Sequence, residues 1–222
     1  GILLYASCSG NSVSSNTITN STDTGIYLRE SSNGNSISAN KIANSNYGIF
    51  LNASTTNTIT TNTITNSNYG IYLNHSSTNT ISSNTITSSG AQGIYLNNNC
   101  SGNDLSGNTV TNSGYQGIYL YYYCSGNSLS GNTITKTSSG YSGIYLYYNC
   151  SGNDLSGNTV TNSGWNGIAL YDSSAGNSLS ENTITNSTTH GIGVYSSSGN
   201  SIFGNTLLNN GVGIYFSSAS GN

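Results

Sequence analysis

Apolar and polar residues alternate in short runs along this chain, and they do not recur every three or four positions. Ile118 and Leu120 flank Tyr119, Leu129 lies between two serines, and Ile134 lies between two threonines. Alternation with a period of two predicts half-buried β-strands, because successive side chains of a strand point to opposite faces.

The strand pattern recurs with a period of 22 to 26 residues over the whole sequence. Each repeat contains Gly-Ile-Tyr-Leu or a near variant, beginning at Gly1, Gly25, Gly48, Gly70, Gly93, Gly117, Gly143, Gly167, Gly191 and Gly213. Such a period is typical of a solenoid, in which each repeat is one coil of a stack. In each coil three short strands turn four apolar side chains inward, for example Ile71, Leu73, Ile81 and Ile86. We therefore predict an all-β fold, a right-handed parallel β-helix of about nine coils.

Two asparagines follow each glycine at nearly constant distances. The first set is Asn11, Asn35, Asn57, Asn79, Asn103, Asn127, Asn153, Asn177, Asn200 and Asn222. The second set is Asn16, Asn40, Asn62, Asn84, Asn108, Asn132, Asn158, Asn182 and Asn205. Asparagine tolerates left-handed backbone, and its amide can bond to the asparagine one coil away. We predict asparagine ladders at the corners of the coils, with no ligand-binding role.

The motif N-x-I-x-x-N-x-I-T-N-S-x-x-x-G-I-Y-L resembles the parallel β-helix repeats of NosD-like proteins and of many bacterial and archaeal surface proteins. The resemblance covers the whole chain and implies the fold. It implies no single activity, because this repeat occurs in lyases, epimerases, adhesins and surface arrays alike. A NosD-type role with copper requires soft ligands, whereas this chain has no methionine and two isolated histidines. We expect no cofactor and no metal site.

Only 4% of the residues are charged, with three basic side chains against six acidic ones. Three scattered basic residues cannot neutralise a nucleic-acid backbone. No apolar run approaches the ~18 residues of a membrane-spanning helix. A surface of hydroxyls and amides that is almost free of lysine favours an extracellular or cell-surface location.

Three of the four cysteines, Cys100, Cys124 and Cys150, occupy the same position in consecutive coils. Because neighbouring coils are ~4.8 Å apart, one pair is close enough for a disulfide; the alternative is a ladder of buried thiols. Six asparagines lie in N-x-S/T sequons and are candidates for N-glycosylation: Asn20, Asn52, Asn74, Asn99, Asn149 and Asn186.

The six carboxylates form no cluster in the predicted coils. Asp104 and Asp154 share a position two coils apart, or ~10 Å, a separation compatible with an inverting glycosidase. They belong to an identical stretch that recurs after two coils, which explains the pair without catalysis. We therefore predict no catalytic residues and no enzymatic activity.

Aromatic residues gather on coils six to eight, before, within and after the Gly-Ile-Tyr-Leu strand. They form a candidate interaction surface of Tyr115, Tyr119, Tyr121, Tyr122, Tyr123, Tyr141, Tyr145, Tyr147, Tyr148, Trp165, Tyr171 and Tyr195. A contiguous patch of this size is more than a monomer usually exposes. Tyrosine and tryptophan suit both sugar rings and the packing of one rod against another.

A third face carries Thr-x-Thr in most coils, for example Thr109 with Thr111 and Thr133 with Thr135. Such ranks resemble the ice-binding face of β-helical antifreeze proteins, although threonine is also an ordinary solvent-facing strand residue.

Our leading hypothesis from the sequence is an extracellular structural or adhesive protein, such as a filament or sheath subunit, that binds copies of itself through open β-helix ends and the aromatic face. We expect residues 1–222 to form a single domain within a longer chain or stack, because neither end shows a cap. The first alternative is a carbohydrate-binding module or polysaccharide-active enzyme that uses the aromatic face, and the second is an ice-binding protein.

Overall fold

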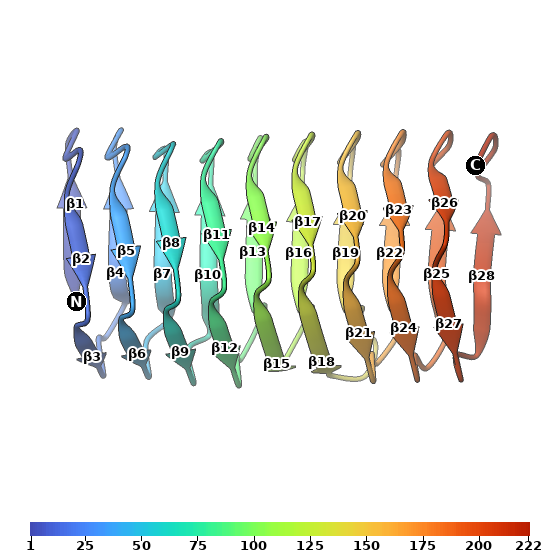
Figure 1. Cartoon of the computed structure of the whole chain (residues 1–222), viewed down its shortest axis with the longest axis horizontal. Coiled ribbons are helices and arrows are strands. Elements are labelled where there is room, and N and C mark those ends of the chain that lie inside the picture. Colours follow the sequence, from blue (N-terminus) through green and yellow to red (C-terminus); the bar gives the residue numbers. More distant parts are fainter.

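The computed structural model describes residues 1–222 as a parallel β-helix whose coils succeed one another along its long axis (Figure 1). All strands belong to three parallel sheets of ten, nine and nine strands, and each coil adds one strand to each sheet. The alternating pattern and the repeat thus predicted the right-handed parallel β-helix correctly. The structure contains no helix of the length and hydropathy that crossing a membrane requires.

The first sheet holds the Gly-Ile-Tyr-Leu strands. Its strands are β1 (Ile2–Tyr5), β4 (Thr24–Arg29), β7 (Tyr47–Asn52), β10 (Tyr69–Asn74), β13 (Ile94–Asn97), β16 (Ile118–Tyr121), β19 (Ile144–Tyr147), β22 (Ile168–Tyr171), β25 (His190–Tyr195) and β28 (Val212–Ser217).

The second and third sheets are built from shorter strands. The second holds β2 (Ser12–Ser14), β5 (Ser36–Ser38), β8 (Thr58–Thr60), β11 (Thr80–Ser82), β14 (Asp104–Ser106), β17 (Ser128–Ser130), β20 (Asp154–Ser156), β23 (Ser178–Ser180) and β26 (Ser201–Phe203). The third holds β3 (Thr17–Thr19), β6 (Lys41–Ala43), β9 (Thr63–Thr65), β12 (Thr85–Thr87), β15 (Thr109–Ser113), β18 (Thr133–Thr137), β21 (Thr159–Thr161), β24 (Thr183–Thr185) and β27 (Thr206–Leu208).

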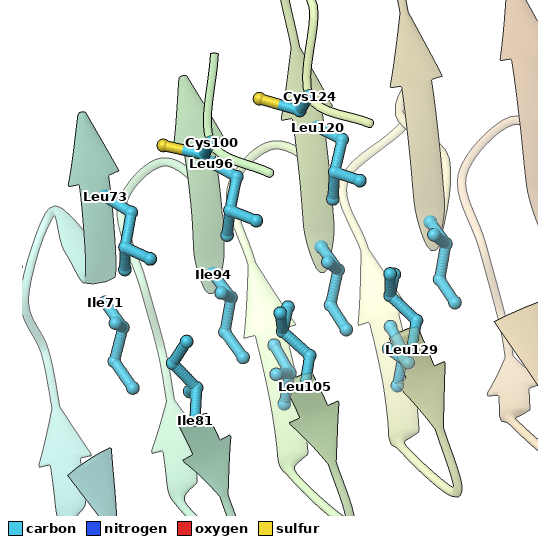
Figure 2. Packing of buried hydrophobic residues seen from close by; sticks show 14 of the residues in the cluster. Ile71, Leu73, Ile81, Ile94, Leu96, Cys100, Leu105, Leu120, Cys124 and Leu129 are labelled. Atoms are coloured by element: carbon cyan, nitrogen blue, oxygen red, sulfur yellow. The ribbon is translucent and has the colours of Figure 1, made fainter. Parts of the chain in front are cut away.

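The core is a set of aliphatic columns that run along the axis. Ile71 pairs in register with Ile94, and Leu73 with Leu96, so like side chains stack on like between coils (Figure 2). The buried hydrophobic cluster counts 34 residues. Burial of this apolar surface is the main force that holds the coils together.

The two asparagine ladders connect every coil to the next. In the second ladder, Asn132 donates from Nδ2 to Asn158 Oδ1 at 3.0 Å and to the Leu105 carbonyl at 2.8 Å. Asn108 donates both its backbone N–H and its Nδ2 to Asn132 Oδ1, at 2.9 and 3.0 Å. Each amide thus satisfies backbone groups that the bend would leave unpaired.

The backbone of the ladder asparagines differs from our expectation. Left-handed φ angles fall on the residue before each of these asparagines, such as Gly107 (63°) and Gly131 (61°), and the ladder asparagines themselves have none. The amide bonds alone therefore explain why these positions are asparagine, because a left-handed backbone is not required there.

The three aligned cysteines form a column of buried free thiols. Each thiol donates to a backbone carbonyl three residues earlier, as Cys124 does to Tyr121 at 3.3 Å. The neighbouring thiols of Cys100 and Cys150, together with burial, raise the pKa of Cys124, which keeps it protonated.

Candidate functional site

A continuous ladder of rings covers the outer side of the first sheet. It consists of the outward side chains of six successive strands: Tyr27, Phe50, Tyr72, Tyr95, Tyr119 and Tyr145. Neighbouring rings stack with centroids 4.7–5.3 Å apart and planes 3–19° from parallel. Each interior ring therefore has another ring against both faces, and only its edge is free for a ligand.

The ring ladder changes the interpretation of the aromatic patch. Tyr119 and Tyr145 are half-buried members of the ladder, and burial raises the pKa of both well above the ordinary range. Their main contribution is cross-strand packing, which aromatic pairs provide in sheets. The residues with free ring surface have to be sought beside the ladder.

Three exposed tyrosines at the corner after the first sheet form a compact group, which we call the corner cluster: Tyr122, Tyr123 and Tyr148. They are 39%, 43% and 39% exposed. Apart from Tyr115, every other exposed large hydrophobic residue belongs to the first coil or to the last three strands, β26 to β28. The corner cluster is thus the main exposed aromatic group along the middle of the rod.

The rings of the corner cluster form two walls at right angles. Tyr122 stacks on Tyr148 with centroids 5.1 Å apart and planes 5° from parallel. Tyr123 stands perpendicular to both, at 90° and 85°. A ligand can contact a ring face and a ring edge together at such a corner.

The backbone of the corner cluster is strained. Tyr122, Tyr123 and Tyr148 have φ angles of 63°, 59° and 64°, a left-handed conformation that costs about 1–2 kcal/mol in a residue with a side chain. The same corner in other coils carries residues such as Asn98 and Ser196. Left-handed corners recur in every coil with residues such as Ala53 and His75, so this corner is distinguished by the three large aromatic side chains that it carries.

The remaining aromatic residues of the predicted surface lie on two sides of the first sheet, before the start of its strands and at their ends. Tyr115 stacks on Tyr141 at 4.7 Å on one side, and Tyr121 stacks on Tyr147 at 5.6 Å on the other. The ladder ends at Tyr145, which Trp165 and Tyr171 meet at 87° and 84°. Tyr171 in turn stacks on Tyr195 at 4.7 Å.

A hydrogen-bonded group, the His190 group, fills the gap beyond the end of the ladder. In coils eight and nine the outward position holds Ala169 and Gly193, and Tyr195 packs into the space over Gly193. His190 Nδ1 lies 2.9 Å from the Tyr195 hydroxyl and 3.0 Å from Asn166 Oδ1. Asn166 also donates from Nδ2 to the Tyr195 hydroxyl at 3.2 Å.

The His190 group combines a neutral base with a phenol. Burial lowers the pKa of His190, so its imidazole is neutral at pH 7 and can accept a proton. Burial raises the pKa of Tyr195, which keeps the phenol protonated as a donor. Sequence reasoning missed this group, because only the loss of the ladder residue at Ala169 and Gly193 marks it.

The carboxylates are dispersed over the rod. Asp104 and Asp154 lie on the second sheet with Ser128 between them, away from the rings. Asp172 lies beside Tyr147 on the aromatic coils, and Asp23 lies near Tyr47 towards the other end of the rod. Burial together with the charge and hydrogen bonding of Asp172 raises the pKa of Tyr147.

The other candidate residues of the sequence lie elsewhere on the rod. The sequons are all at or beside corners; Asn20, Asn99 and Asn186 are exposed, and Asn74 donates to Asn52 Oδ1 at 2.9 Å. The Thr-x-Thr residues stack in register on the third sheet, as Thr109 does on Thr133 and Thr111 on Thr135.

Comparisons with known proteins agree with this fold. Residues 1–134 match the family described as the right-handed β-helix region, and residues 136–222 match the family described as periplasmic copper-binding protein (NosD). None of the curated proteins matches the chain.

Solved structures with a similar fold include two enzymes and a tailspike protein. The chain superposes on the periplasmic alginate epimerase AlgG with a TM-score of 0.67 at 18% identity, covering 91% of this chain and 58% of that one. For DFA-IIIase from Arthrobacter chlorophenolicus A6 the TM-score is 0.70 at 15% identity, covering 92% of this chain and 60% of that one. For the Dettilon tailspike protein the TM-score is 0.71 at 18% identity, covering 94% of this chain and 54% of that one. The chain thus spans between half and two thirds of the length of these three structures.

The residues present do not fit a copper site of the kind that the second family description names. No three His, Cys, Asp or Glu side chains come together as metal ligands. The three thiols lie in a line, one per coil, and ligands in a line cannot converge on one ion as soft-metal sites require.

The comparisons correct our prediction that the chain is not an enzyme. Several solved structures that share the fold are enzymes: alginate and mannuronan epimerases, an alginate lyase and DFA-IIIase. The prediction was wrong because it looked only for clustered carboxylates. It did not consider a histidine and a tyrosine of one strand that meet an asparagine of the preceding coil.

Proposed function

The chain belongs to the right-handed β-helix family, and within it we propose a glycan-binding protein that works outside the cytoplasm, in the periplasm or the extracellular space. The corner cluster holds the glycan. The observation that carries this proposal is that two neighbouring coils keep three exposed tyrosines on strained, left-handed backbone.

The chemistry of tyrosine supports a glycan as the ligand. A sugar ring has an apolar face of C–H groups and a rim of hydroxyls, and tyrosine offers an apolar ring with a hydroxyl at its tip. None of the hydroxyls of Tyr122, Tyr123 and Tyr148 bonds to another side chain or to the backbone. They are free to bond sugar hydroxyls.

The comparisons support the same choice over a filament subunit. Proteins with this fold include enzymes that by name act on alginate, and one family description names a periplasmic protein. Self-assembly through the ends or the aromatic face has no comparable support, and it stays a prediction of the sequence.

A depletion assay on insoluble polysaccharides tests the proposal. The variants Tyr123→Asn and Tyr148→Asn introduce the residue found at the equivalent corners, Asn149 and Asn98. Both of these asparagines have left-handed φ angles, so the variants remove the rings without adding backbone strain. We expect either variant to weaken retention about tenfold or more, as loss of an aromatic anchor usually does.

The matched control is Tyr5→Asn. Tyr5 lies in the first coil and is 49% exposed, slightly more than the cluster tyrosines, and the aligned position in the third coil is Asn52. Its retention should equal that of the unaltered chain. Equal retention of all four proteins would contradict a role for the corner cluster.

A second candidate function is enzymatic, and the His190 group favours it. In the tautomer in which Nδ1–H donates to Asn166 Oδ1, Nε2 of the neutral imidazole can accept a proton from a bound sugar. The Tyr195 hydroxyl, 2.9 Å from Nδ1, donates a proton to the leaving oxygen. Under this hypothesis His190 and Tyr195 transfer protons, and Asn166 positions both of them.

Product analysis tests the enzymatic hypothesis. The chain is incubated with polysaccharides, and new reducing ends and unsaturated sugars are measured. Loss of products in His190→Ala and Tyr195→Phe, with full activity in the control His75→Ala, would support it. Turnover that survives in both variants would refute it.

A further inference from the structure

The charges around the corner cluster are few and all of one sign. Tyr122 and Tyr148 occupy the same position in two neighbouring coils. The coil after them carries Asp172 at this position, and the coil before them carries Asn98. No lysine or arginine lies on the first sheet or on the corner after it between coils five and nine.

The three basic side chains of the chain lie elsewhere. Arg29 pairs with Glu30 and lies over the Tyr5 ring at 4.8 Å. Arg29 is four strands from Tyr121 along the first sheet, or ~19 Å at the usual strand spacing, which exceeds the Debye length of ~8 Å at physiological salt. Lys41 and Lys136 belong to the third sheet.

From this arrangement we infer that the glycan is a neutral polysaccharide and not a polyuronate such as the alginate on which several proteins of similar fold act. The inference rests on the proposed function of the corner cluster. A polyuronate carries one carboxylate per sugar, and recognition of carboxylates depends on arginine or lysine. The cluster offers neither, and Asp172 repels an anionic chain at its end.

The same groups suit a neutral sugar. The carboxylate of Asp172 accepts hydrogen bonds from sugar hydroxyls, and such charge-assisted bonds are stronger than neutral ones. The amide of Asn98 at the other end both donates and accepts. Between them the tyrosine rings supply the apolar contact. The row Asn98, Tyr122, Tyr148 and Asp172 thus places two rings between two polar ends along the rod axis, and an uncharged sugar chain can use all four.

Affinity electrophoresis with soluble polymers tests the inference. Gels contain either a neutral polymer (β-glucan, xylan or galactomannan) or a polyuronate (alginate or polygalacturonate), at pH ~8, where an ordinary histidine is neutral. The measured quantity is the retardation that Tyr123→Asn and Tyr148→Asn remove, so that binding at other surfaces is not counted.

We expect a neutral polymer to bind the corner cluster about tenfold or more tighter than either polyuronate, because like charges oppose the latter. Raising the salt from about 20 to about 200 mM should leave the neutral interaction unchanged, because no ion pairs are screened. The variant Asp172→Lys should gain retardation by polyuronates.

The outcomes separate the inference from the proposed function. Cluster-dependent retardation by polyuronates that equals or exceeds that of every neutral polymer would overturn the inference and leave the proposed function standing. Retardation by no polymer, or retardation that the two tyrosine variants do not change, would overturn the proposed function and the inference with it.

Discussion

At the scale of single residues, one ladder asparagine makes hydrogen bonds that connect several coils of the rod. Asn132 is fully buried, accepts two hydrogen bonds from Asn108 and donates to Leu105 and Asn158. No other side chain has an acceptor and two donors in this compact geometry. The hydrogen bonds of the side-chain amide therefore explain why this corner requires asparagine.

We predict that Asn132→Ala lowers the free energy of unfolding by about 3 kcal/mol, because it leaves buried backbone and amide groups of two neighbouring coils unpaired. Urea denaturation measures the loss. The control is Asn162→Ala, at an exposed corner where only Asn186 donates to the amide; we expect it to cost about 1 kcal/mol, from the left-handed backbone. Similar losses in both variants would contradict the ladder as the main polar support.

The tyrosines of the corner cluster, unlike Asn132, contribute little to the free energy of unfolding. Left-handed backbone costs about 1–2 kcal/mol, whereas the stacked pair of Tyr122 and Tyr148 contributes about 0.5–1.5 kcal/mol. The two terms nearly cancel. We therefore predict that Tyr148→Asn changes the free energy of unfolding by less than about 1 kcal/mol while it weakens glycan binding. A loss above about 2 kcal/mol in urea denaturation would mean that the ring serves the fold.

At the scale of elements, glycine sets how closely the first sheet approaches the third. A Cβ on Gly117 would lie 2.4 Å from Ile134 Cγ2 and 2.8 Å from the Gly143 carbonyl oxygen. Neither atom can move freely, because Ile134 belongs to the core and Gly143 to the backbone that leads into β19. The repeated glycine is therefore a packing requirement of the strand.

We predict that Gly117→Ala destabilises the fold by about 2–3 kcal/mol, as overpacking of a core does. Gly131→Ala is the control, since nothing lies within 4 Å of its Cβ position, and only the left-handed backbone at φ 61° opposes it, at about 1 kcal/mol. Thermal and urea denaturation of both variants provide the comparison. A smaller loss in Gly117→Ala than in Gly131→Ala would be incompatible with the close approach.

The strands and their register could be predicted from sequence because the pattern is local. Alternation at Ile118, Tyr119 and Leu120 defines the inward and outward sides of one strand, and the repeat aligns the next strand with it. The ring ladder could not be read in the same way. Whether Tyr119 presents a face or an edge depends on the stacking of Tyr95 and Tyr145 against it, and sequence spacing carries no information on ring planes.

At the scale of the whole molecule, function has to be sought where coils differ from the repeat. A repeat specifies the same scaffold in every coil, so departures from it are the informative positions. Tyr122, Tyr123 and Tyr148 stand at left-handed corners where the other coils carry no aromatic ring of this size, and Ala169 and Gly193 interrupt the ring ladder. The sequence predicted the first group as part of a wide aromatic surface. It did not reveal the second, because His190 joins Asn166 only when the coils stack.

The most direct test of the account is the crystal structure of the chain with a bound neutral oligosaccharide, chosen as the fragment that best competes with polymer binding. The account predicts a sugar ring in contact with Tyr123 and the Tyr122–Tyr148 pair, with hydroxyls bonded to Asp172 or Asn98. An oligosaccharide seated on the threonine face, or on the second sheet away from the tyrosines, would contradict it.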